Sequence, residues 1–236
     1  MSPFRQAADS LGALADDLRR KMYLYIRRQG RPVGRDEAAG AVGISRKLAA
    51  FHLDKLVEKG LLEAHYARLT GRSGPGAGRP SKLYEPSEQE VSLSIPHRSY
   101  DFVGSILVDA VESRRPHESA RDAARRVAWD TGLELGKRTR RETRRRPSSA
   151  ARALAAATET LEECGYEPYV DAGGDVRLRN CPFHALARKS PELVCGLNQA
   201  LLDGLLKGLG ARGAEAVLDP RPHECCVRLT KTRKVA

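Results

Sequence analysis

The chain has 236 residues, a length that suits one large domain or two small ones. Hydrophobic residues make up 41% of it and charged residues 30%, which is typical of a globular protein with a real core. Because the sequence has no signal-peptide pattern and no apolar run near 18 residues, we do not expect secretion or membrane spanning. The expected location is the cytoplasm.

Charge and cysteine occupy different parts of the chain. Of the net charge of +11, residues 1–90 and 91–146 each carry +5, whereas the last 90 residues carry +1. A basic region beside a balanced one indicates a polyanion-binding part joined to a different part. In a cytoplasmic protein, clustered cysteines favour metal or redox chemistry over a disulfide framework. The five cysteines all lie in the last third of the chain, at Cys164, Cys181, Cys195, Cys225 and Cys226.

The first elements form a recognisable series. Apolar residues at helical spacing predict one helix over residues 11–29, which ends at a glycine. A short Ala-rich helix over 35–42 follows and ends at Gly43. Ser45 suits the N-cap of another helix, which continues to about residue 58.

Two short strands, over 61–64 and 82–84, then flank a Gly- and Pro-rich loop over 71–80. Helix, glycine turn, helix and two-stranded wing in this order predict a winged helix-turn-helix, whose second helix enters the major groove of double-stranded DNA. Its early residues and the wing supply the predicted DNA contacts: Ser45, Arg46, Lys47, Ala50, Phe51, His52, Lys55, Arg72, Arg79 and Lys82. Arg46 and Lys47 suit either guanine edges or phosphates.

The remaining elements are mainly helical. We predict helices over 100–112, 118–137, 150–163 and 191–209, a hairpin over 167–178, and strands over 216–218 and 225–229. The basic run over 137–146 is interpreted as a solvated helix or linker. The expected fold class is therefore α+β and mostly helical, with a DNA-binding domain over 1–90, a linker and dimerisation helices over 91–149, and a cysteine-containing sensor domain over 150–236.

Three segments of the N-terminal part carry a family resemblance. They are Gly43-Ile44-Ser45-Arg46-Lys47, the stretch HLDKLVEKGLL over 52–62, and the wing GRPSKLY over 78–84. In this order they resemble ArsR-like winged-helix bacterial regulators, over residues 11–86 approximately. The resemblance implies a homodimer that binds a double-stranded DNA operator.

The cysteine spacing narrows the chemistry of the C-terminal part. No Cys-x-x-Cys pair is present, so a structural zinc ribbon or finger fits poorly. Widely spaced thiolates from separate elements suit an iron–sulfur cluster, which usually has four ligands. Successive strand residues point to opposite faces, so Cys225 and Cys226 serve one cluster only if the backbone is irregular there.

The cysteine segments carry a second resemblance. Asn180-Cys181-Pro182-Phe183-His184, PELVCGLN over 191–198, and Cys225-Cys226-Val227-Arg228-Leu229 resemble the C-terminal sensor of the Suf-operon repressor (SufR) family. This implies a repressor of iron–sulfur assembly genes, or a paralogue with other targets, that carries an oxygen-sensitive [4Fe-4S] cluster. Some members have a fourth cysteine where this chain has Gly210. We therefore assign Cys181, Cys195, Cys225 and Cys226 as ligands, and the other candidates for the fourth position are Cys164, His184, His223 or a carboxylate.

Several alternatives stay open. A metal-free thiol sensor would use Cys225 and Cys226 as an oxidisable pair, and a zinc or haem regulator would use the same cysteines, with Cys181 before Pro182 as a haem ligand. A third alternative is a metal-dependent enzyme fused to a DNA-binding domain. The sequence has no phosphate loop, nucleophile elbow or H-E-x-x-H motif, so we do not expect an enzyme. In the favoured hypothesis, cluster loss shifts the linking helices and changes the spacing of two recognition helices.

Overall fold

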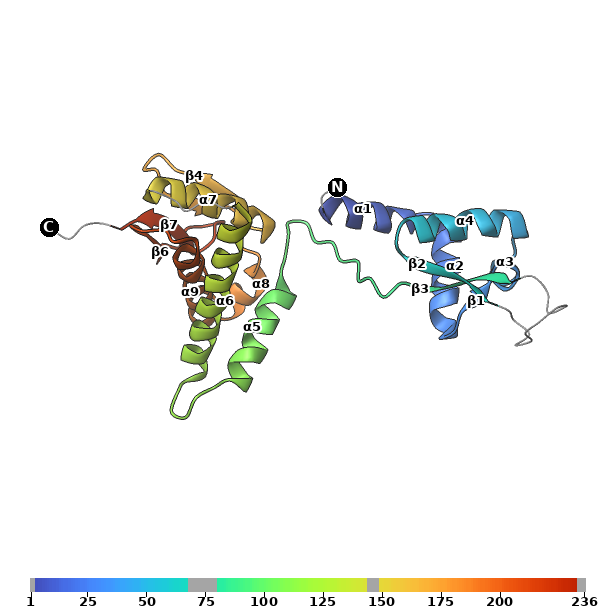
Figure 1. Cartoon of the computed structure of the whole chain (residues 1–236), viewed down its shortest axis with the longest axis horizontal. Coiled ribbons are helices and arrows are strands. Elements are labelled where there is room, and N and C mark those ends of the chain that lie inside the picture. Colours follow the sequence, from blue (N-terminus) through green and yellow to red (C-terminus); the bar gives the residue numbers. More distant parts are fainter. Residues whose placement is uncertain (1–2, 68–79, 144–148, 233–236) are drawn as a thin grey trace. The chain divides into compact units, whose positions relative to one another are not determined.

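The computed structural model describes residues 3–67, 80–143 and 149–232 and divides into two compact units, Met1–Leu93 and Ser94–Ala236 (Figure 1). Both units combine helices with a small antiparallel sheet, so the α+β, mostly helical fold class is confirmed. Of the helices in the described ranges, each is either too short or too polar to cross a bilayer.

In its described residues, the N-terminal unit places a three-stranded sheet beside four helices. The sheet has the order β1-β3-β2, with Val33 opposite Tyr84 and Tyr66 opposite Lys82. Its core is formed by apolar side chains of α2, α4 and the sheet. The elements are α1 (Pro3–Ala13), α2 (Asp17–Gln29), β1 (Val33–Gly34), α3 (Arg35–Val42), α4 (Arg46–Glu58), β2 (Leu62–Ala67) and β3 (Ser81–Pro86).

A tight turn joins α3 to α4. Gly43 ends α3 with φ of +73°, a left-handed conformation that glycine adopts without steric cost. Two residues later, the Ser45 hydroxyl accepts a hydrogen bond from the Leu48 N–H at 3.3 Å and caps α4. The predicted helices over 35–42 and 45–58 are confirmed, as is the strand pair that follows them.

The prediction of one helix over 11–29 is wrong. The chain forms two helices, and Asp16 separates them with an extended backbone (φ −72°, ψ 127°). Its carboxylate accepts a hydrogen bond from the Arg19 N–H at 2.9 Å, so it caps α2. The apolar stripe continues through the break at the same spacing, which is why periodicity alone did not reveal it. The short strand β1 also carries no periodic signal.

The C-terminal unit packs helices around a four-stranded antiparallel sheet of order β4-β5-β7-β6. Helices α6 and α9 lie side by side, and α5 packs on α6 (Figure 1). The linker and dimerisation helices are expected over 91–149, and from Ser94 onward this segment belongs to the same unit as the cysteine region. The elements are α5 (Tyr100–Glu112), α6 (Ala120–Thr143), α7 (Ala150–Glu163), β4 (Pro168–Val170), β5 (Val176–Leu178), α8 (His184–Lys189), α9 (Pro191–Leu209), β6 (Ala214–Leu218) and β7 (Val227–Lys231).

Glycines bring α6 and α9 into backbone contact. A Cβ added at Gly132 would lie 1.9 Å from the Leu201 carbonyl oxygen, and one at Gly204 would lie 2.1 Å from the Trp129 carbonyl oxygen. No real side chain fits at such distances, so only glycine allows this helix pair to approach so closely. Cys195 is half-buried near the N-terminal end of α9, so the packing of α9 on α6 helps to position that residue.

Candidate functional site

The exposed face of α4 carries most of the predicted DNA contacts. Arg46 pairs with Asp36 of α3 at 2.7 Å, and both side chains are 65% exposed. Lys47 is exposed and makes no ion pair with any residue in the described ranges. Phe51, one turn later, is 62% exposed. Ser45 caps the helix, and Ala50 is half-buried. The start of α4 thus presents cations and an aromatic ring to solvent.

Two further predicted DNA contacts, Lys55 and Lys82, form ion pairs with carboxylates. The Lys55 ammonium lies 2.8 Å from Glu58, and the Lys82 ammonium of β3 lies 2.6 Å from Asp54 of α4. Asp54 also accepts a hydrogen bond from the Tyr84 hydroxyl at 3.1 Å, so the base of the hairpin is fastened to α4. The other two predicted wing contacts, Arg72 and Arg79, lie outside the described residues.

The assignment of His52 as a DNA contact is wrong. Its side chain is buried, with 6% of the residue exposed, and its Nδ1 lies 3.9 Å from the Asp16 carboxylate. It occupies the same side of α4 as the core residues Ala49, Leu53 and Leu56. A buried imidazole on that side cannot reach a base edge, so His52 belongs to the packing of α4 against the start of α2.

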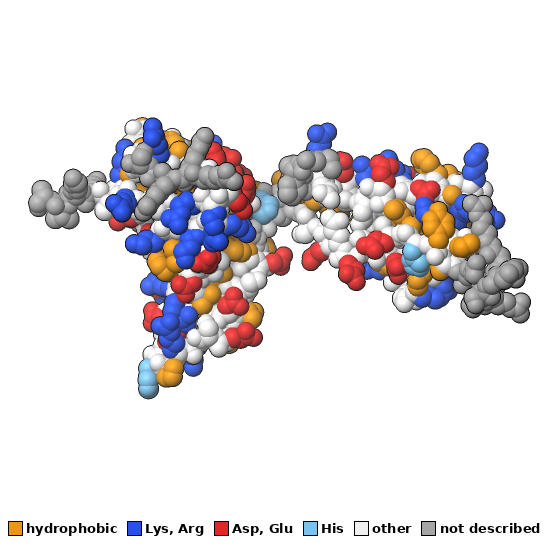
Figure 2. Space-filling view, in the orientation of Figure 1, with side chains coloured by type: hydrophobic (Ala, Val, Ile, Leu, Met, Phe, Trp, Pro, Cys, Tyr) orange, Lys and Arg blue, Asp and Glu red, His pale blue; other side chains and the backbone are white. Residues whose placement is uncertain are grey.

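Figure 2 shows how charge is distributed over each unit. On the N-terminal unit, hydrophobic side chains lie among Lys and Arg side chains at the surface over α4. On the C-terminal unit, Lys and Arg side chains gather over α6, whose last turns carry the described part of the predicted basic run. Both basic regions are therefore surface features.

Four cysteines from three segments converge inside the C-terminal unit. Cys181 lies in the turn between β5 and α8, Cys195 lies in α9, and Cys225 and Cys226 precede β7. Cys181 and Cys225 are 8% and 2% exposed, and the other two are half-buried. The four thiols shift one another's pKa values in the order Cys181, Cys225, Cys226 and Cys195, so they lie near one another. Spacing in the sequence gave no direct sign of this order.

The linked thiols have unequal acidities. The hydrogen bond to Cys225, together with burial, raises the pKa of Cys181 far above its ordinary value. The hydrogen bond with Cys181 lowers the pKa of Cys225, but the bond to Cys226 and burial outweigh this and raise it to about 12. The bond to Cys195 raises the pKa of Cys226 to about 12, whereas Cys195, which accepts that bond, has a lowered pKa.

The prediction that Cys225 begins a strand is wrong, and the difference explains how adjacent cysteines join one group. Strand β7 begins at Val227, and the backbone at 225–226 is irregular. The Cys225 N–H donates to the Leu178 carbonyl at the end of β5, and the Cys226 carbonyl accepts from the Asp219 N–H after β6, both at 2.8 Å. The bend at Cys226 interrupts the strand alternation that would point adjacent side chains to opposite faces, so both thiols can join the same group.

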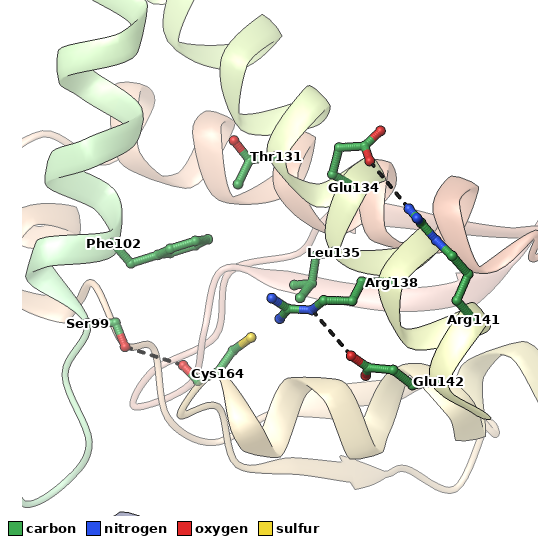
Figure 3. Close-up of a pocket in the computed structure, with 9 residues that line it drawn as sticks. All are labelled: Ser99, Phe102, Thr131, Glu134, Leu135, Arg138, Arg141, Glu142 and Cys164. Atoms are coloured by element: carbon green, nitrogen blue, oxygen red, sulfur yellow. Dashed lines mark hydrogen bonds and ion pairs between the residues drawn. The ribbon is translucent and has the colours of Figure 1, made fainter.

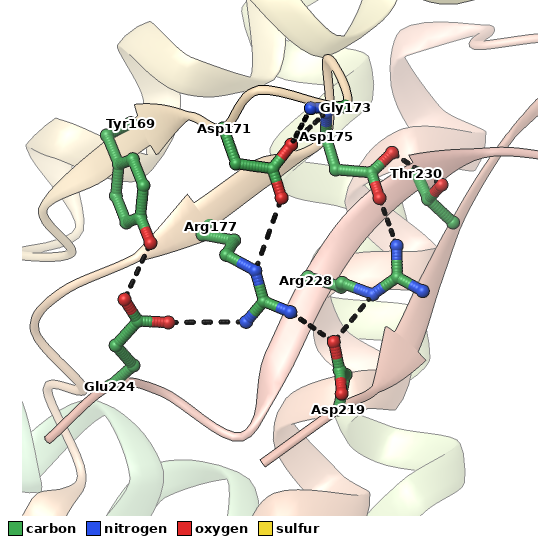
Figure 4. A network of polar contacts seen from close by, with 9 residues as sticks. All are labelled: Tyr169, Asp171, Gly173, Asp175, Arg177, Asp219, Glu224, Arg228 and Thr230. Carbon is green, nitrogen blue, oxygen red and sulfur yellow. Dashed lines mark hydrogen bonds and ion pairs between the residues drawn. The ribbon is translucent and has the colours of Figure 1, made fainter. Parts of the chain in front are cut away.

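A buried ion-pair network holds the segment before these cysteines (Figure 4). The Arg177 side chain of β5 is 2% exposed and pairs with Asp171, Asp219 and Glu224. Glu224, directly before Cys225, also accepts a hydrogen bond from the Tyr169 hydroxyl at 2.6 Å. The residues at both ends of the 219–224 segment are thus bonded to one guanidinium, which restricts where Cys225 and Cys226 lie.

A buried polar relay ends at the sulfur of Cys225. The Asn198 side-chain N–H donates to the Cys225 Sγ at 3.2 Å, and the Asn198 Oδ1 accepts from the Tyr166 hydroxyl at 2.5 Å. All three residues are at most 3% exposed. An N–H donor lowers the basicity of a sulfur ligand and fixes its orientation, so Asn198 suits a site whose sulfur binds a metal or acts as a thiolate.

A second buried amide fixes the turn that carries Cys181. The Asn180 side-chain amide donates to the carbonyls of His97 at 2.9 Å and Gly165 at 2.7 Å, and its oxygen accepts from Arg98. Arg98 also donates to the Cys181 carbonyl at 3.2 Å. The turn is therefore held through its backbone and its neighbour, which leaves the Cys181 thiol free to face the other cysteines.

The other candidate ligands lie elsewhere. Cys164 is the C-cap of α7 and faces a cavity of about 830 Å³ together with Phe102, Leu135 and Arg138 (Figure 3). Burial raises the pKa of its thiol. His184 and His223 are both exposed. Of the candidates for the fourth ligand, Cys226 is thus the one that lies with Cys181, Cys195 and Cys225.

Four thiols match the donor type and ligand number of a [4Fe-4S] cluster, and also of a zinc site with four cysteine ligands. In the described ranges, however, no group of three or more His, Cys, Asp or Glu side chains is placed so that it could hold a metal ion. Metal binding would require the thiols to lose their protons and to move into ligand positions. The donor chemistry of the four residues therefore fits a metal or cluster, although their placement in this structure does not itself form the site.

No protein-family model matches the sequence, and no curated protein matches it either.

The residues that support the cysteines could be predicted from the sequence only in part. Asn198 follows Cys195 by three positions and so shares its helix face, a signal that spacing offers. Tyr166 and Arg177 come from other elements, and only the tertiary fold brings them to the site.

Proposed function

We propose that the protein is a DNA-binding transcription regulator, acting as a repressor, whose C-terminal unit senses iron–sulfur or redox status through a [4Fe-4S] cluster. Cys181, Cys195, Cys225 and Cys226 would bind the cluster as thiolates. The observation that carries the proposal is the convergence of these four thiols from three segments, in a chain whose other unit has the order helix, tight turn, helix and hairpin. The protein would act as a homodimer on a double-stranded DNA operator and catalyse no reaction.

The support for DNA binding is the face of α4. A capped helix after a glycine turn presents Arg46 and Lys47 to solvent, and the hairpin lies next to it. This is the arrangement in which a recognition helix enters the major groove while the wing contacts the flanking backbone. The unit fits a winged helix-turn-helix better than a protein-contact module because its region of the chain carries +5.

The DNA-binding half is tested with the protein's own promoter. Replacing both Arg46 and Lys47 with Ala should weaken binding and reduce the salt dependence of the affinity, because two cations near the phosphates are lost. Arg121→Ala plus Arg140→Ala is a matched control in the other unit. Unchanged affinity and salt slope in the α4 variant would remove the recognition-helix assignment.

The sensing half is tested by anaerobic purification followed by visible spectroscopy and analysis of iron and sulfide. Wild-type protein should be coloured and contain about four iron and four sulfide per chain. Cys225→Ser should lose most of both, whereas Cys164→Ser should keep them, because Cys164 lies outside the thiol group. A colourless, iron-free wild-type protein would reject the cluster.

A second candidate function, metal-free thiol sensing, is favoured by the coupling between neighbouring thiols. The coupling runs from Cys181 through Cys225 and Cys226 to Cys195, and it includes the adjacent pair Cys225 and Cys226. In an oxidised pair, two thiols would give up two electrons and two protons to a hydroperoxide, forming one disulfide, water and an alcohol. Peptide mapping of peroxide-treated, metal-free protein should then find a disulfide between neighbouring members of this group. Four reduced thiols after peroxide treatment would reject metal-free thiol sensing.

A further inference from the structure

The outward face of α4 carries an aromatic ring that packing does not explain. Lys47, Phe51 and Asp54 follow one another at helical spacing on the face opposite to the buried residues Ala49 and Leu53. Phe51 is 62% exposed, and its described ring contact is an edge-on approach to His52, with centroids 5.3 Å apart. Leu48, at the edge of this face, is 39% exposed. An apolar surface on a helix that is otherwise charged indicates a contact with a partner.

The charges around the ring specify the partner's chemistry. Lys47 lies one turn before Phe51 and has no ion-pair partner in the described ranges. Asp54, three positions after Phe51, pairs with Lys82 at 2.6 Å and accepts a hydrogen bond from Tyr84. Along the helix, Phe51 therefore lies between an exposed cation and a carboxylate that is already paired. This pattern is complementary to a polyanion with an apolar group in its groove.

In the major groove of DNA, the apolar group on the base edges is the C5 methyl of thymine. We propose that Phe51 is a specificity-determining residue that packs on a thymine methyl in each half-site, while Lys47 contacts the adjacent backbone. This inference rests on the proposed DNA-binding function and deepens it. At one position of the operator, the base would be recognised by the aromatic ring and not by a hydrogen-bonding side chain.

The experiment uses the full-length protein and a random double-stranded DNA library. After sequences have been enriched by binding, each thymine of the preferred site is replaced in turn by uracil, which pairs identically and lacks only the methyl group. At one thymine per half-site, wild-type affinity should fall about fourfold, the factor expected for the burial of one methylene-sized group. Phe51→Ala should bind thymine and uracil sites equally, and Phe51→Leu should keep part of the preference.

Phe4→Ala is the matched control, because Phe4 is also exposed, at 54%, but lies in α1. It should behave as wild type. Uracil tolerated by the wild type at every position, or a uracil penalty that persists in Phe51→Ala, would overturn the inference while leaving DNA binding intact. If no sequence is enriched at all, the proposed function fails first and the inference fails with it.

Discussion

The two units hold their candidate residues in opposite environments. In the N-terminal unit, Arg46 and Lys82 are surface cations, each tied to an exposed carboxylate. In the C-terminal unit, Cys181 and Cys225 lie within the hydrophobic core, and buried polar groups hold them. Exposed ion pairs contribute little to stability and exchange partners readily, whereas a buried polar group costs free energy when it loses its partner. The exposed cations and the buried thiols therefore belong to separate units of one chain.

The largest effect should come from the helix pair of the C-terminal unit. Gly132→Ala places a methyl group against the Leu201 carbonyl and should destabilise this unit by about 3 kcal/mol, as overpacked cores do. Denaturant unfolding followed at the single Trp of α6 measures it. Gly104→Ala, with no atom within 4 Å of the added Cβ, is the control and should be neutral or stabilising. Equal effects of the two substitutions would mean that the close contact between α6 and α9 at Gly132 does not stabilise this unit.

The second-largest effect on stability should come from the ion-pair network around Arg177. Arg177→Met leaves three carboxylates without their shared guanidinium and should cost about 2 kcal/mol, less than a fully buried pair because the carboxylates are partly exposed. Arg121→Met breaks an exposed pair with Glu192 and should cost no more than about 0.5 kcal/mol. Thermal unfolding of both variants distinguishes them. A neutral Arg177→Met would show that the network does not hold the cysteine segment.

A smaller loss of stability should follow from changes in the polar relay of Tyr166, Asn198 and Cys225. Asn198→Ala removes the N–H donor to Cys225 and the acceptor of the buried Tyr166 hydroxyl, and should cost about 1–2 kcal/mol. Tyr166→Phe should cost about 1 kcal/mol. In a double-mutant cycle the two changes should be coupled by more than about 0.5 kcal/mol, because they share one hydrogen bond. Additive costs would mean that the relay is not a unit.

The smallest effect on stability should come from the surface of the N-terminal unit. Asp54→Asn removes an exposed ion pair and should change the free energy of unfolding by less than about 0.5 kcal/mol. It should nevertheless strengthen DNA binding a few-fold at low salt, because it removes a carboxylate from α4 and releases Lys82. Affinity measured at two salt concentrations checks this. Weaker binding would show that the Lys82–Asp54 pair positions the hairpin for DNA.

The sequence predicted local features better than convergent ones. Gly43 and Ser45 carry their own signals, and the turn that they predicted is present. Asp16 also has a capping signal, but the uninterrupted apolar stripe concealed the break between α1 and α2. At Cys225 and Cys226, alternation on a regular strand argued against a shared site. The backbone bends at Cys226 before β7 begins, and its bonds to β5 and to the end of β6 are contacts that no local pattern contains.

In the proposed regulator, the buried thiols govern the DNA affinity of the exposed helix. The most direct measurement compares the operator affinity of anaerobically purified protein before and after chelation of its iron, for wild type, Cys164→Ser and Cys225→Ser. Wild type and Cys164→Ser should lose about tenfold in affinity on iron removal, within the usual range of allosteric coupling, whereas Cys225→Ser should not respond. The same affinity with and without iron in the wild type would contradict the claim.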